Sequence, residues 1–137
     1  MHWTLGRQEQ ARAIYDRIVQ IAPNDIDARQ WLALMHTLAA RIPEAIAEKR
    51  QIVRICLQQR DYDGAIAELH QIIALDQSDV DAYFELGDVL MRRHEYEQAL
   101  RIYGRLAKMP NVELERVEAL QAAAKRMYEQ QLQVKNS

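Results

Sequence analysis

Residues 95–100 read EYEQAL, and residues 61–66, which stand 34 positions earlier, read DYDGAI. The correspondence extends beyond these short stretches, since Leu86 follows Ile52 by the same 34 residues. Self-similarity at a fixed period of about 20 to 50 residues is typical of proteins built from stacked structural repeats. The chain is therefore expected to be an array of small, similar units in which each unit packs against its neighbours.

The N-terminal half of the chain has the same period in a different phase. Ala45 follows Ala11 by 34 residues, whereas Ala65 follows Ala45 by only 20 residues. Because that distance holds about one helix and a turn, the segment near residues 43–60 fits two templates, the second helix of one repeat and the first helix of the next. We expect one shared helix, an odd number of helices and a local departure from regular stacking. Either a decayed repeat has lost a helix, or the irregularity has a function.

Helical periodicity and capping residues mark the individual elements. Apolar or small residues at positions 82, 83, 86, 87 and 90 form a one-sided stripe with the period of an α-helix. Asp25, Asp61 and Asp79 precede such stripes, where a carboxylate oxygen can cap free backbone N–H groups, and Pro43 suits a first helical turn. The expected helices lie near residues 4–21, 25–40, 43–60, 62–75, 79–92, 95–109 and 112–132.

The best-preserved unit resembles a known family. Residues 80–110 are similar to a complete tetratricopeptide repeat, with the closing proline, Pro110, one residue early. Residues 46–79 match less well, because Lys49 replaces a large residue, and residues 6–25 match only a second helix. The family's large and small positions in the best unit are occupied by Tyr83, Leu86, Gly87, Leu90, Tyr96, Ala99, Tyr103 and Leu106.

The resemblance implies a fold class and a domain organisation. The fold would be all-α, with antiparallel helix-hairpin repeats stacked as a short right-handed α-solenoid of about seven helices. Residues 1–137 would form a single tetratricopeptide-like domain. Its parts would be a partial repeat (1–25), irregular repeats with a shared helix near 43–60 (26–79), the best repeat (80–111) and a capping helix (112–134).

Composition limits the classes of function. Hydrophobic residues make up 49% of the chain and charged residues 28%, with a formal net charge of -2, so the basic excess of a nucleic-acid-binding protein is absent. The start of the sequence lacks the basic end and apolar run of a signal peptide, and no stretch approaches the ~18 apolar residues of a membrane span. The sequence therefore predicts a cytoplasmic protein without membrane insertion.

The residues that usually carry catalysis or bind metals are poorly arranged for either role. The four histidines have no partner at i+4, and the phosphate-binding, dinucleotide-binding and nucleophile-elbow motifs are missing. The single cysteine, Cys56, lies on an apolar stripe and is expected to be buried as a small hydrophobe. We predict no enzymatic activity, no cofactor and no metal.

The resemblance also implies a binding surface, because the first helix of each repeat in this family lines a concave groove for a peptide or a partner helix. Arg50 and Arg54 are one turn apart and could fork a carboxylate, or they could instead pair with Glu48, Asp61 or a neighbouring helix. The lysine and asparagine clamp that some members use for chaperone tails is not reproduced. The candidate partner-binding residues are Gln30, Trp31, Leu34, Arg50, Gln51, Arg54, Leu57, Phe84, Glu85, Asp88 and Met91.

Two alternatives to groove binding are considered. The first is a structural subunit of a larger complex or a homo-oligomer, formed through an open N-terminal edge near Trp3, Leu5 and Tyr15. The second is an RNA-binding helical repeat. Equivalent positions in successive repeats are occupied by Arg54 and Asp88, so no base-reading code repeats, and nucleic acid is not expected as a partner.

Overall fold

Seven α-helices and no strand make up the regular secondary structure of residues 5–136, the part of the chain that the computed structural model describes. The all-α fold class and the number of helices are as the sequence predicts. The helices are α1 (Leu5–Ile21), α2 (Ile26–Leu38), α3 (Ile42–Gln58), α4 (Tyr62–Leu75), α5 (Val80–Arg92), α6 (Tyr96–Ala107) and α7 (Leu114–Asn136).

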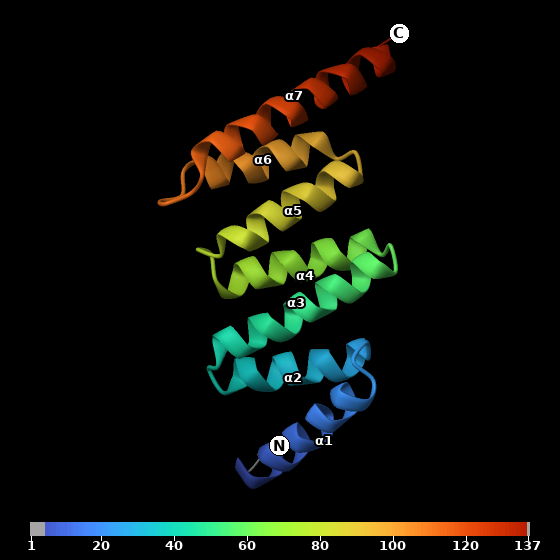
Figure 1. Ribbon diagram of the computed structural model, residues 1–137, viewed down its shortest axis with the longest axis vertical. Coiled ribbons are helices and arrows are strands. Elements are labelled where there is room, and N and C mark those ends of the chain that lie inside the picture. The colour runs from blue at the N-terminus through green and yellow to red at the C-terminus, as the bar shows by residue number, and fades with distance from the viewer. Residues whose placement is uncertain (1–4, 137) are drawn as a thin grey trace. The chain divides into compact units, whose positions relative to one another are not determined.

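The helices group into two compact units, one ending at Leu75 and the other beginning at Asp76. In the first unit α1 packs on α2, α2 on α3, and α3 on α4; in the second, α5 packs on α6 and α6 on α7. Successive helices within each unit run in opposite directions (Figure 1). This packing of chain neighbours is the solenoid-type arrangement predicted for helix-hairpin repeats, and the positions of the repeat boundaries stay a prediction.

The predicted capping residues cap the N-termini of three helices. Asp25, Asp61 and Asp79 each accept a hydrogen bond from the backbone N–H three residues later, at 3.0, 2.9 and 3.1 Å. Each bond satisfies one of the N–H groups that a helix leaves free at its N-terminus. Pro43 lies in the first turn of α3, where its missing N–H costs nothing.

Non-glycine residues in the left-handed region end three helices. Ala40, Arg60 and His94 follow α2, α3 and α5 with φ angles of 60°, 58° and 60°. The residue after each one donates its backbone N–H to the carbonyl five residues earlier, at 2.8–2.9 Å. This bonding pattern satisfies carbonyls at the helix C-terminus and usually employs glycine at the left-handed position.

The start of the last helix differs from the prediction. The sequence suggests a helix from about residue 112, whereas α7 begins at Leu114 and runs on to Asn136. Asn111 has a φ angle of 60°, so its backbone turns away from the helical region just before the predicted start.

The best repeat is built around the contact between Gly87 of α5 and Tyr103 of α6. A Cβ atom placed on Gly87 would lie 2.3 Å from the Tyr103 ring, so only glycine fits while the two helices keep this spacing. Tyr103 is 1% exposed, and its neighbours on α6, Ala99 and Leu106, are fully buried. Gly87 and Tyr103, which occupy a small and a large position of the family pattern, are therefore in contact across the helix pair.

Candidate functional site

All eleven predicted partner-binding residues are at least partly accessible to solvent. Trp31, Leu34, Arg54, Glu85 and Asp88 are exposed, and the other six are half-buried. Those from Gln30 to Leu57 lie on α2 and α3 of the first unit, and those from Phe84 to Met91 lie on α5 of the second. The structure thus gives each unit its own part of the predicted surface.

A ridge of apolar side chains on α2 is the most distinctive part of the first unit's surface. Trp31, Leu34 and Leu38 are 44%, 49% and 73% exposed, and their spacing of three and four residues aligns them along one side of the helix. The opposite side carries the buried Leu32 and Ala33. We call these three exposed residues the α2 ridge. Leu38 is not among the predicted residues, although its position seven residues after Trp31 could have indicated it.

Two pockets adjoin the α2 ridge, and Leu34 lines both of them. The first, of about 530 Å³, is walled by α2, α3 and α4, with Lys49, Gln71 and Leu75 among its lining residues. The second, of about 270 Å³, lies between α1 and α2 and is lined by Gln8 and by all three ridge residues. The Trp31 ring also stacks on Tyr15 of α1, with a centroid distance of 5.6 Å. The first unit therefore presents a ridge bordered by two hollows.

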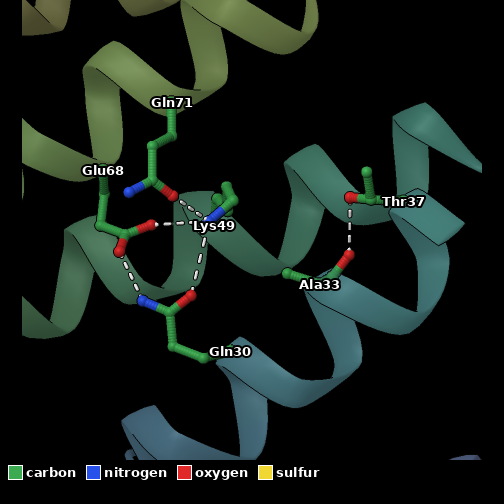
Figure 2. A network of polar contacts seen from close by, with 6 residues as sticks. All are labelled: Gln30, Ala33, Thr37, Lys49, Glu68 and Gln71. Atoms are coloured by element: carbon green, nitrogen blue, oxygen red, sulfur yellow. Dashed lines mark hydrogen bonds and ion pairs between the residues drawn. The ribbon is translucent and has the colours of Figure 1, made fainter. Parts of the chain in front are cut away.

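A polar network forms one wall of the larger pocket (Figure 2). The Lys49 ammonium group lies 3.2 Å from Oε2 of Glu68 and donates to Oε1 of Gln71 at 2.5 Å and to Oε1 of Gln30 at 3.4 Å. Gln30 in turn donates from Nε2 to Oε1 of Glu68 at 2.5 Å. All three Lys49 donors thus have acceptors, and Gln30, a predicted groove residue, is held inside the unit by both ends of its amide.

The predicted basic part of the surface lies on α3. Arg54 is exposed, and its Nε donates to Oε1 of Gln51 at 3.0 Å, which links two of the predicted residues. Arg50 is half-buried. Glu48, one of the carboxylates considered as a partner for these arginines, forms an ion pair of 3.0 Å with Arg29 of α2. The forked carboxylate of a partner stays a prediction.

The predicted surface of the second unit is an aromatic and charged face on α5. The Arg116 guanidinium of α7 lies 4.0 Å from the centroid of the Phe84 ring, in cation–π geometry. Asp88 and Arg92 form an exposed ion pair of 3.3 Å. Burial, followed by the charge of Asp88, raises the pKa of Tyr103 to about 12, so this phenol stays protonated. Arg116 belongs to this face, although it is not among the predicted residues.

The N-terminal edge is only partly described. Trp3 lies outside the described residues. Tyr15 is half-buried by its stacking on Trp31, and further along α1 the side chains of Ile14 and Ile21 are 60% and 79% exposed. This edge therefore has two separate exposed isoleucines.

The residues considered for chemistry lie in ordinary structural surroundings. Cys56 is buried, and burial, followed by the charge of Asp61, raises the pKa of its thiol, which disfavours a nucleophilic thiolate. Within residues 5–136 no group of three or more histidine, cysteine or acidic side chains could hold a metal ion. None of the helices in the described range has the length and apolar character needed to cross a membrane.

Comparisons with known proteins find similarities in sequence and in structure. Two solved structures align with the chain. "Crystal structure of MamA" is 16% identical, with a TM-score of 0.45, and the alignment covers 99% of this chain and 97% of that one. "Crystal structure of MamA protein" is 17% identical, with a TM-score of 0.45 and coverage of 93% and 82%. No curated protein matches the sequence. Two sequence models described as tetratricopeptide repeat match residues 57–133, more than half of the chain, and residues 1–25.

Proposed function

The chain belongs to the tetratricopeptide repeat family, and we propose that it is a non-enzymatic interaction module that binds a peptide or a partner protein through the residues predicted to line its groove. Repeats of this family generally mediate protein–protein interaction or scaffolding. In the first unit the α2 ridge is the apolar anchor of the proposed surface and the exposed Arg54 of α3 is its positive charge, whereas α5 of the second unit offers the negative charges of Glu85 and Asp88.

The exposure of the α2 ridge is the observation that carries this proposal. Within the described residues, the large hydrophobic side chains that remain exposed lie on α1, α2 and α7 and none on the four helices between them. The ridge holds three of these side chains in one continuous line, and one of them is a tryptophan. Contiguous apolar patches on soluble proteins mark interaction sites, and tryptophan is among the residues that contribute most to binding energy.

The charged residues of the proposed surface determine which charged segments of a partner they attract. Arg54 is exposed on α3, whereas Glu85 and Asp88 are exposed on α5. A partner with an acidic segment would meet the first helix, and one with a basic segment would meet the second. Charges at the rim of an interface mainly raise the association rate and exclude wrong partners, so their removal weakens binding less than removal of the ridge.

Affinity capture with matched variants tests the proposal. The full chain is immobilised, a lysate is passed over it, and retained proteins are identified by mass spectrometry for the wild type, Trp31→Ala and Ile21→Ala. A partner retained by the wild type and by Ile21→Ala, but lost with Trp31→Ala, supports the proposal. Equal retention by all three proteins places the interface elsewhere. Retention of nucleic acid alone would favour the RNA-binding alternative.

A second candidate is a structural subunit that assembles through the N-terminal edge. The exposed Ile14 and Ile21 on α1 favour it. A change of Ile14 to Glu would disrupt assembly through α1 while leaving the α2 ridge intact. Light scattering of this variant therefore separates assembly through the edge from binding at the ridge.

A further inference from the structure

We infer that the α2 ridge binds a second copy of this chain, packed antiparallel across a two-fold axis beside Leu34. The inference rests on the proposed function in that it takes the ridge to be an interaction surface, and it adds the identity of the occupant.

The shape of the surface matches itself. A two-fold interface uses the same patch on both copies, so the patch must offer both a projection and a hollow. The projection is the α2 ridge, and the hollows are the pockets of about 530 Å³ and about 270 Å³ that share Leu34 as a wall. Pockets of a few hundred Å³ accommodate small apolar groups, so each copy's ridge can enter the hollow beside the other copy's ridge.

The spacing along the helix is also suited to a two-fold axis. Trp31 and Leu38 lie three residues before and four residues after Leu34, on the same side of α2. When two such helices pack antiparallel with Leu34 at the crossing, each Trp31 faces Leu38 of the second copy. The exposed apolar residues of the ridge then cover one another.

Charge does not oppose this arrangement. The charged group in the walls of the larger pocket is Lys49, and Glu68 neutralises it at 3.2 Å. Gln8 and Gln71, which line the two pockets, are uncharged. Asp27, in the first turn of α2, lies one turn before the ridge, and antiparallel packing keeps the two copies of Asp27 at opposite ends of the contact. A neutral apolar surface of this kind suits its own copy better than a strongly charged peptide.

Light scattering coupled to size-exclusion chromatography tests the inference on the full chain. We expect the wild type to be a dimer at concentrations above about 10 μM and Leu34→Glu to be a monomer, because two carboxylates would meet at the axis and raise the dissociation constant about 100-fold or more. Leu34→Lys should be a monomer for the same reason. Mixing the two variants should restore a dimer, since glutamate then faces lysine.

The controls distinguish a loss of dimerisation from a loss of folding, and they test where the interface lies and which partner occupies it. Circular dichroism verifies that each variant is folded, and Ile14→Glu, which changes an exposed apolar residue on α1, should remain a dimer. A wild type that stays monomeric, or a dimer that persists in Leu34→Glu, overturns the inference. If the wild type is a monomer but captures another protein in a Trp31-dependent manner, the inference that a second copy occupies the ridge is wrong, and the proposed function stands. If Ile14→Glu alone dissociates the dimer, the interface is the N-terminal edge.

Discussion

The ammonium group of Lys49 lies 3.2 Å from the carboxylate of Glu68 inside the first unit, at a position where the repeat pattern has a large apolar residue. Their side chains are only 12% and 8% exposed. Two charges removed from water lose hydration energy, and the attraction between them offsets this loss only if the remaining donors and acceptors are also satisfied. Gln30 and Gln71 supply those bonds, so the network joins α2, α3 and α4.

Removal of one member of this pair should be costly. Lys49→Met keeps the length of the side chain but leaves the Glu68 carboxylate buried without its cation. We expect the free energy of unfolding to fall by about 3–5 kcal/mol, measured by urea denaturation. The double variant Lys49→Met with Glu68→Met removes both charges and should recover most of the loss. A single variant as stable as the wild type would show that the pair contributes little.

Gly87 should tolerate no side chain because of Tyr103. In Gly87→Ala the new methyl group would lie 2.3 Å from the Tyr103 ring, so α5 and α6 must move apart. Overpacking of this kind costs about 1–3 kcal/mol. Gly104 on α6 is the matched control, since a Cβ there meets no atom within 4 Å and Gly104→Ala should stabilise its helix by about 0.5–1 kcal/mol. Thermal unfolding of both variants measures the difference, and shifts in the same direction would contradict it.

Structural features that depend on residues close together in the sequence could be predicted. The capping role of Asp25 follows from its place before an apolar stripe, and the small and large positions of the best repeat, Gly87 and Tyr103 among them, follow from the resemblance to a tetratricopeptide repeat. The fold class could be predicted for the same reason, because periodicity is a local property that is repeated many times.

Features that depend on two distant side chains could not be predicted. Lys49 departs from the repeat pattern, but Glu68 is 19 residues away on another helix, and no neighbouring residue in the sequence indicates that it pairs with Lys49. The contact of Arg116 with Phe84 joins α7 to α5, and no sequence pattern indicates it either. Which residues form the binding surface depends on such distant contacts and stays a prediction. The helices that carry these residues were predicted closely.

The left-handed residues at helix ends offer a route to higher stability. Arg60 has a φ angle of 58°, which costs a side-chain-bearing residue about 1–2 kcal/mol relative to glycine. Arg60→Gly should therefore raise the free energy of unfolding by about 0.5–1 kcal/mol, after allowance for the extra freedom that glycine gives the unfolded chain. The neighbouring Gln59 has a φ angle of -87°, so Gln59→Gly should lower stability by a similar amount. Equal effects of the two substitutions in urea denaturation would contradict this explanation.

The stability of the first unit should depend on pH through His36. Burial, followed by the charges of Arg41 and Arg12, lowers the pKa of His36 below 6.5, despite the opposing charges of Glu44 and Glu48. Arg41 donates from Nε to Nδ1 of His36 at 3.2 Å, a bond that requires this nitrogen to be unprotonated. Because the unfolded chain binds the proton more readily, the contribution of His36 to stability is complete above the unfolded pKa of 6.5 and is lost as the pH falls through that value toward the lower folded pKa. His36→Gln keeps an acceptor and cannot titrate, so its unfolding midpoint in urea should change less between pH 7.5 and 5.5 than that of the wild type. Parallel pH profiles for the two proteins would rule out His36 as the responsible group.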